Sequence, residues 1–528
     1  MHFNSLTVLL PFLPLILANQ PLCNPSTFTS LSLPDTKILN ITTTPHTNLT
    51  LSVPDEQNHF ATNITSLSAC EVLIAYTHTD AEETSPPTQP PSNTTQEYPA
   101  DTVLTTIVLP LPSKWTGRLL GAGGGGWVTG VDDPRTLFWA ASRGFAVTST
   151  NSGLSNPAPP TWALVSPGQL NMRLVHNFAS RSVLEAGTLG KAVAKTYYGR
   201  DVRKSYWNGC SQGGRQGHIV AQRFAGVYDG VLATAAGLHW GELAMQFMWA
   251  QAVMNDAGVY PSACEFEGIH IAAVGKCDAG EGIVLDSTCE FDAGGLVGET
   301  VECPSMNSSA VVTEMAARVA KATWQGSRTP EGGFLWYGLD VSARLVYHAA
   351  TVCGPNGTCV GDPNAITVEW QKYFLAMDPE FDVKTINTTT FAELFKESIK
   401  WDPLIAATDP DLSAFAKAGG KMITWHGTSD VLLGSKGTES YVKSVYDLDP
   451  KAAEYYRYFE APGLDHCGFG TKGYYPGDAL DSLIAWVENG TEPDTLKALN
   501  RETGKEADLC LWPKKLVYVG GNSSLACQ

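Results

Sequence analysis

The pattern of hydrophobic and polar positions divides the chain into two kinds of segment. From Thr102 onward, short runs rich in β-branched residues alternate with stretches whose apolar residues recur at helical spacing. Strands are predicted at Val103–Leu109, Arg118–Leu120, Phe145–Thr150, Val202–Trp207, Gly230–Thr234, Gly420–Trp425 and Tyr455–Glu460. Helices are predicted at Asn177–Tyr198, Gln216–Phe224 and Asp478–Glu488. This alternation predicts an α/β fold with a parallel or mixed sheet.

The alternation breaks between residues 236 and 408. This segment holds six of the twelve cysteines, several Gly-rich loops and helical patterns at Ala310–Lys321 and Phe391–Ile399. A chain of 528 residues exceeds one typical domain without clearly making two. We therefore expect a core formed by residues 101–235 and 409–528, with an inserted lobe at 236–408.

The first 100 residues differ from the rest in composition. Residues 1–18 contain an apolar stretch from Leu6 to Leu17 that is too short and too Pro-broken to span a membrane, and we interpret them as a secretory signal peptide. Residues 19–100 are rich in Thr, Ser, Asn and Pro, and Thr84–Glu97 is of low complexity. We expect a secreted protein with an N-terminal glycosylated arm at 19–100.

Cysteines, sequons and net charge agree with an extracellular protein. Twelve cysteines behind an export signal predict disulfides, and local spacing favours the pairs Cys353–Cys359, Cys510–Cys527 and Cys23–Cys70. The net charge of −18 disfavours a nucleic acid or an anionic membrane as partner. Nine Asn-x-Ser/Thr sequons suit a glycosylated surface; they stand at Asn40, Asn48, Asn63, Asn93, Asn307, Asn356, Asn387, Asn489 and Asn522.

A Gly-x-Ser-x-Gly motif with Ser211 at its centre joins a predicted strand to a predicted helix. This spacing suits a sharp turn that exposes a serine hydroxyl above a sheet, and the flanking glycines avoid collisions in that turn. A nucleophilic serine needs a base, and the base needs an orienting acid. In the α/β-hydrolase architecture the order is serine, acid, histidine, each after a strand. Asp430 and His466 fit this order, with Asp465 or Asp402 as alternative acids.

A run of glycines follows the strand Arg118–Leu120. Consecutive glycines let backbone N–H groups converge on an oxyanion, and we expect Gly124 and Gly125 to do so together with the N–H of Gln212. A phosphate-binding loop is the competing interpretation, but no Gly-Lys-Ser/Thr follows. A second competing interpretation is that the glycine run is a flexible linker.

Two cysteines neighbour the predicted nucleophile and base. Cys210 precedes Ser211, and Cys467 follows His466. If the serine and histidine meet, the two sulfurs lie close enough to bond and would tie the two loops together. The alternative is that each cysteine pairs elsewhere.

These motifs together resemble a known family. Gly-Cys-Ser-x-Gly-Gly-Arg-Gln-Gly, His-Gly-x-x-Asp and His-Cys-Gly are similar to the motifs of the tannase/feruloyl esterase family of secreted serine esterases, and Lys195–Arg200, Asp411–Trp425 and 485–490 also resemble its pattern. The resemblance covers roughly residues 100–235 and 400–515. It implies an α/β-hydrolase fold with a lid domain at 236–408, a triad of Ser211, Asp430 and His466, and a disulfide between Cys210 and Cys467.

The resemblance also implies a reaction: hydrolysis of feruloyl or galloyl esters of plant phenolic acids, with no cofactor for catalysis. Two other classes remain open, a serine peptidase of the same fold and a catalytically silent wall- or glycan-binding protein. Activity on model esters without activity on peptides would exclude the peptidase. Labelling of Ser211 by a fluorophosphonate would exclude the silent binding protein.

The family further implies a structural calcium site in the lid. Its loop corresponds here to a run that opens with Cys277, in which Asp278, Glu281 and the carbonyl of Ile283 can fill family positions. The run is shortened and lacks at least one family aspartate, for which Asp286 is a substitute. The alternative is a loop closed by a Cys277–Cys289 disulfide, with solvated acidic residues.

Overall fold

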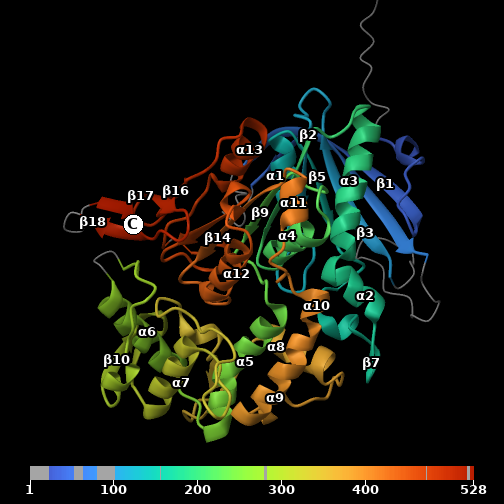
Figure 1. Cartoon of the computed structure of the whole chain (residues 1–528). Coiled ribbons are helices and arrows are strands. Elements are labelled where there is room, and N and C mark those ends of the chain that lie inside the picture. Colours follow the sequence, from blue (N-terminus) through green and yellow to red (C-terminus); the bar gives the residue numbers. More distant parts are fainter. Residues whose placement is uncertain are drawn as a thin grey trace, which may run out of the picture.

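A nine-stranded mixed sheet lies at the centre of the molecule, in the order β1-β2-β3-β5-β4-β8-β9-β14-β15 (Figure 1). The computed structural model describes residues 23–52, 63–79, 101–131, 133–154, 156–278, 282–470, 472–519 and 524–528. The predicted signal peptide, the low-complexity segment Thr84–Glu97 and Glu281 lie outside the described residues. The sheet strands are β1 Thr36–Leu51, β2 Ile64–His78, β3 Val103–Pro110, β4 Arg118–Ala122, β5 Phe145–Thr150, β8 Lys204–Cys210, β9 Gly230–Thr234, β14 Lys421–Gly427 and β15 Tyr456–Ala461.

The strands from β5 to β15 run parallel, whereas β1, β2 and β3 add to them antiparallel. All residues of β5 and β9 are buried. A parallel strand that is covered on both faces favours an apolar sequence, as β9 and residues 145–147 of β5 show. The predicted α/β class is confirmed.

The sequence reading assigned no strand to residues 19–100, yet β1 and β2 form one edge of the sheet. The inner strand β2 buries Val72, Ile74 and Tyr76. The outer strand β1 is mostly exposed or half-exposed, so its Thr-rich sequence looks like a polar arm. Threonine is β-branched and suits an extended strand even where few side chains are buried.

Helices cover both faces of the sheet. On one face α3, α4, α11 and α12 pack against it, and on the other α1 and α13 do. The predicted helix at Asn177–Tyr198 is a π-helical turn at Asn177–Arg181 followed by α3. The bounds are α1 Arg135–Ser142, α2 Met172–His176, α3 Ser182–Tyr198, α4 Gln212–Arg223, α11 Ser413–Lys417, α12 Ser435–Leu448 and α13 Ala479–Asn489.

Residues 240–405, here called the helical region, lie below the sheet in Figure 1. Its described residues contribute no strand to the nine-stranded sheet. The predicted helix at Ala310–Lys321 begins later, at Glu314, because Ser308–Val311 pair with a neighbouring strand and Thr313 caps the helix. The elements are α5 Trp240–Ala257, α6 Ala263–Cys277, β10 Thr300–Cys303, β11 Ser308–Val311, α7 Glu314–Gln325, β12 Thr351–Cys353, β13 Cys359–Gly361, α8 Ala365–Glu369, α9 Thr388–Ser398 and α10 Asp402–Ile405.

Three two-stranded sheets lie outside the central sheet and the helical region: β6 Leu164–Ser166 with β7 Gln169–Leu170, β16 Thr495–Leu499 with β17 Glu506–Cys510, and β18 Leu516–Val519 with β19 Ser524–Cys527. Within the part of the chain that the structure describes, no helix combines the length and the hydropathy needed to cross a membrane.

All twelve cysteines lie among the described residues and form six disulfides. The three pairs favoured by local spacing are present. The Cys277–Cys289 bond, considered as an alternative for the calcium loop, is also present. Cys264–Cys303, which ties α6 to β10, was not predicted. The remaining bond joins Cys210 to Cys467.

Candidate active site

Ser211 stands at a sharp turn between β8 and α4. Its φ of 59° and ψ of −119° are unusual for a residue with a side chain. Backbone hydrogen bonds hold this conformation: the Ser211 N–H donates to the carbonyl of Thr234 at 3.0 Å, and its carbonyl accepts from Gly237 at 3.1 Å. The strained turn points to a functional role, because such backbone is otherwise avoided.

The glycines around Ser211 are required by close backbone contacts. A Cβ at Gly209 would lie 2.5 Å from the backbone of Gly213. A Cβ at Gly214 would lie 2.5 Å from the carbonyl oxygen of Thr234. The turn therefore closes only because these positions lack a side chain.

Asp430 lies in the loop after β14 and is 1% exposed. Its Oδ1 accepts from the backbone N–H groups of Leu432 and Leu433, both at 2.8 Å. Its Oδ2 is 2.6 Å from Nδ1 of His466. Burial raises the pKa of Asp430, but the charge of His466 and the hydrogen bonds from His426 and His466 outweigh it and hold the pKa well below the ordinary value. The carboxyl group is therefore ionised.

His466 follows β15 and is 4% exposed. Burial lowers its pKa, but the charge of Asp430, their hydrogen bond and the charge of Asp465 together raise the pKa above the ordinary value. Because Asp430 accepts at Nδ1, the neutral ring carries its proton there and leaves Nε2 as the basic nitrogen.

The alternative acids have other partners. Asp465 accepts from the backbone N–H of His466 at 2.6 Å and from Arg344 at 2.9 Å, so it bonds to the backbone of His466 and not to its ring. Asp402 begins α10 and neighbours Glu242 instead. Burial and the charge of Glu242 raise the pKa of Asp402 to about 8.

The disulfide between Cys210 and Cys467 brings the serine and histidine loops together, with the two Cα atoms 5.9 Å apart. Ser211 and His466 are the direct neighbours of these cysteines in sequence. The Ser211 hydroxyl makes no hydrogen bond with any described residue, so its contact with His466 stays a prediction. Hydrogen bonds of this kind are often long in a free enzyme and tighten when substrate binds.

The glycine loop lies against the elbow. The Gly213 N–H donates to the carbonyl of Gly124 at 2.7 Å. The Gly124 N–H already donates to Oε1 of Gln216 at 3.2 Å. A Cβ at Gly125 would meet nothing within 4 Å, and Gln212 is the first residue of α4, where an N–H has no partner within the helix. The Gln212 N–H at the start of the helix is thus available to an oxyanion, the Gly124 N–H has a partner in Gln216, and the role of Gly125 stays a prediction.

His426 was missed by the sequence reading. It lies at the end of β14, is 1% exposed, and its Nε2 is 3.0 Å from Oδ2 of Asp430. Its position four residues before Asp430, in the His-Gly-x-x-Asp motif, is the only signal that the sequence offers.

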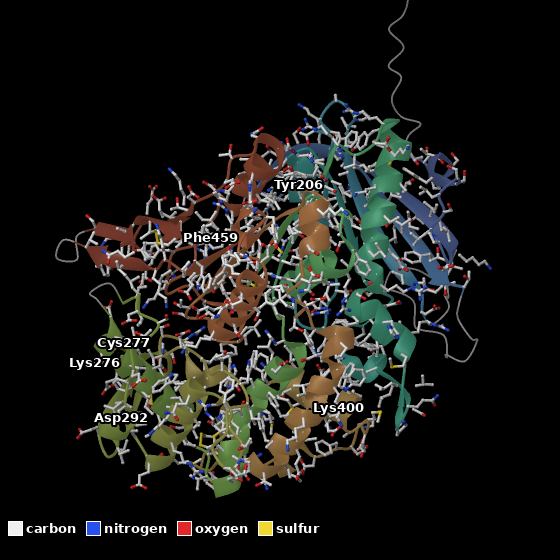
Figure 2. All side chains as sticks on the ribbon, viewed as in Figure 1. Tyr206, Lys276, Cys277, Asp292, Lys400 and Phe459 are labelled. Atoms are coloured by element: carbon white, nitrogen blue, oxygen red, sulfur yellow. A yellow bond between two sulfur atoms is a disulfide. The ribbon has the colours of Figure 1, made fainter. Side chains whose placement is uncertain are left out.

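Of the predicted calcium ligands, Asp278 and Ile283 lie among the described residues, whereas Glu281 does not. The carboxylate of Asp278 accepts from the backbone N–H groups of Gly282 and Ile283 at 2.7 and 3.2 Å, and Asp286 accepts from Thr288. No group of three or more His, Cys, Asp or Glu suited to a metal occurs within the described ranges. Cys277, which opens this loop, lies at the edge of the helical region. In Figure 2 it is well separated from Tyr206, which marks the sheet.

Comparison with known proteins identifies relatives over most of the chain. The family model "Tannase and feruloyl esterase" matches residues 95–528. A probable feruloyl esterase of Arthroderma benhamiae is 36% identical over 444 residues, which are 81% of this chain and 82% of that protein. The resemblance predicted from the motifs is confirmed.

Solved structures show the same fold. The tannin acyl hydrolase of Aspergillus niger has a TM-score of 0.84 at 24% identity and covers 96% of this chain and 95% of its own. Feruloyl esterase B of Aspergillus oryzae has a TM-score of 0.75 at 22% identity and covers 96% and 99%. The predicted α/β-hydrolase fold is confirmed.

Proposed function

Because the chain belongs to the tannase and feruloyl esterase family, we propose that it is a secreted serine esterase that hydrolyses feruloyl or galloyl esters of plant phenolic acids. The observation that carries the mechanism is the buried pair of His466 and Asp430, with 2.6 Å between Nδ1 and Oδ2, next to the disulfide that ties this loop to Ser211. These elements are the base, the acid and the nucleophile of a hydrolytic triad.

Acylation begins when Nε2 of His466 takes the proton of the Ser211 hydroxyl. The serine oxygen then attacks the ester carbonyl, and the resulting oxyanion accepts hydrogen bonds from the N–H groups of Gln212 and Gly125. The positive end of α4 stabilises the same negative charge. His466 returns its proton to the alcohol as the C–O bond breaks, which leaves an acyl group on Ser211.

Deacylation repeats these steps with water in place of the serine. His466 deprotonates the water, which attacks the acyl carbonyl, and then protonates Ser211 as the phenolic acid leaves. Asp430 stays ionised throughout and stabilises the imidazolium of His466. The raised pKa of His466 suits a base that must accept a proton readily. No step requires a cofactor or calcium.

The helical region supports a second part of the proposal. We assign residues 236–408 as the lid over the site and residues 101–235 and 409–528 as the catalytic core. The buried apolar residues from α5 to α10 form one cluster, which also takes in Trp127, Trp162 and Phe178 from the segment 101–235 and is separate from the two clusters that flank the sheet. Six disulfides support secretion, because such bonds persist in oxidising compartments.

A comparative assay tests this proposal. The purified protein is given methyl ferulate, methyl gallate, p-nitrophenyl acetate and a peptide amide. We expect hydrolysis of at least one phenolic ester and no hydrolysis of the peptide. The ratio of the rates on methyl ferulate and methyl gallate then shows which acyl group the enzyme prefers. Cleavage of the peptide would support a peptidase instead, and binding to wall glycans without turnover of any ester would support a silent binding protein.

A further inference from the structure

The buried ring of His426 makes polar contacts on both of its nitrogens. Its Nε2 is 3.0 Å from Oδ2 of Asp430 and 3.0 Å from the carbonyl oxygen of Leu433. Its Nδ1 is 2.8 Å from the hydroxyl of Thr438. The ring thus joins the end of β14, the loop that carries the acid, and helix α12.

These contacts determine which nitrogen of the neutral ring carries the hydrogen. Both partners of Nε2 are oxygens without a proton to donate, since Asp430 is ionised and the Leu433 oxygen is a carbonyl. Nε2 must therefore carry the hydrogen. In the neutral ring Nδ1 then accepts from the Thr438 hydroxyl. His426 is a donor to the carboxylate and not a second base.

Oδ2 of Asp430 consequently accepts from two imidazoles, those of His426 and His466. Oδ1 accepts from the two backbone N–H groups of Leu432 and Leu433. With two donors on each oxygen, the carboxylate is fixed in orientation, and its negative charge is shared among four N–H groups.

We propose that His426 is a positioning residue of the proposed triad: by donating to the same oxygen as His466, it fixes the Asp430 carboxylate and limits the negative charge that reaches the His466 ring. This inference rests on the proposed function of Ser211, His466 and Asp430. Without His426, Oδ2 would interact more strongly with protonated His466 and would keep His466 protonated to a higher pH.

Other groups also lie near His466 and Asp430, but the test does not change them. Asp465 adds negative charge and is held by Arg344 at 2.9 Å. His348 lies near Asp430, but burial lowers its pKa, so it is neutral at the pH at which His466 titrates. Phe469 has its ring centroid 6.3 Å from that of His466 and carries no charge. Each of these groups is unchanged when only His426 is replaced.

Two substitutions at His426 separate the donor from the rest of the ring. In His426→Gln the side-chain amide reaches the place of Nε2 and can still donate to Asp430. In His426→Asn the shorter amide reaches only the place of Nδ1, near Thr438. Both variants keep a polar side chain at residue 426, and they differ in whether that side chain can donate a hydrogen bond to Asp430.

The readout is the pKa of His466, followed by proton NMR with its signals assigned by a His466→Gln variant, and by the acid limb of kcat/KM on p-nitrophenyl acetate. We expect His426→Asn to move this pKa upward by about one unit, and kcat/KM at pH values below it to fall by about 10-fold. His426→Gln should titrate close to wild type.

An unchanged pKa in folded His426→Asn, or equal shifts in the Asn and Gln variants, would overturn the inference. The NMR titration does not depend on turnover, so it tests His426 even if the wild-type protein hydrolyses no ester. In that case the proposed function fails by itself. Equal thermal midpoints of the two variants establish that a difference in pKa does not arise from unfolding.

Discussion

The nine-stranded sheet and the helical region position their residues by different means. In the sheet, Ser211, Asp430 and His466 follow β8, β14 and β15, so their relative positions depend on the register of parallel strands. The disulfide that joins two of their loops spans 257 residues of sequence. In the helical region the three disulfides span only 39, 12 and 6 residues.

The helical region meets the sheet region through a cluster of aromatic rings. The rings of Trp370 and Phe374 stack with centroids 4.7 Å apart, and Trp127 reaches Phe374 from the loop after β4 at 5.3 Å. The arrangement of Ser211, Asp430 and His466 therefore depends on long-range order in the sheet, whereas the disulfides of the helical region are local.

Removing one disulfide from each region is expected to have the largest effect on stability. In the chain-entropy model, Cys210→Ala/Cys467→Ala lowers the free energy of unfolding by about 5 kcal/mol, because a very long loop is released. The matched Cys353→Ala/Cys359→Ala variant releases a loop of 6 residues and lowers it by about 2 kcal/mol. Guanidinium denaturation followed by tryptophan fluorescence measures both. Equal losses would contradict the proposed contrast between long-range and local crosslinks.

Buried histidines in each region are expected to make stability depend on pH. Burial lowers the pKa of His218 in α4 to about 4, and that of His270 in α6 to about 4. An unfolded histidine binds a proton near pH 6.5. Stability is therefore full above this value and is lost as the pH falls toward 4, by up to about 3 kcal/mol for fully buried His218.

The variants His218→Gln and His270→Gln test this dependence separately. Each should flatten the fall in the free energy of unfolding between pH 7 and pH 4, and His218→Gln should flatten it more because His270 is less deeply buried. A wild-type stability that is constant over this range would show that neither histidine titrates as expected.

Glycine substitutions give the smallest predicted effect, with opposite signs in the two regions. Gly275 lies inside α6, where a Cβ meets nothing within 4 Å. Gly275→Ala should raise the free energy of unfolding by about 0.5–1 kcal/mol, because alanine loses less backbone entropy in a helix. Gly214→Ala should lower it, since the new Cβ would lie 2.5 Å from the Thr234 oxygen. Thermal midpoints measure the sign, and a stabilising Gly214→Ala would contradict the elbow geometry.

The same contrast explains how much of the fold could be predicted. The predicted strands Phe145–Thr150 and Gly230–Thr234 agree with β5 and β9 to the residue, since β9 is an almost wholly apolar run and β5 follows residues 145–147 with two β-branched threonines. Helix α5 was not predicted, because it is buried on most of its surface and its apolar residues show little periodicity. Strand β1 was missed for the opposite reason, since few of its side chains are buried.

For the site, local motifs were sufficient to choose candidates but not to arrange them. Gly-x-Ser-x-Gly, Asp430 and His466 stand out because each follows a predicted strand. Asp465 and Asp430 could not be separated as acids until the structure showed which carboxylate meets the His466 ring. His426 could not be assigned a role, because its contacts depend on how the loop after β14 folds back.

The central claim is that Ser211 is the nucleophile, and fluorophosphonate labelling with peptide mapping tests it most directly. We predict one adduct, on the peptide that contains Ser211, and none in Ser211→Ala, whose kcat/KM on phenolic esters should fall by about 10⁴-fold or more. Ser444→Ala is the control, because Ser444 is exposed on α12 and its hydroxyl donates to the carbonyl of Ser440. An adduct on another residue, or ester hydrolysis that persists in Ser211→Ala, would contradict the account.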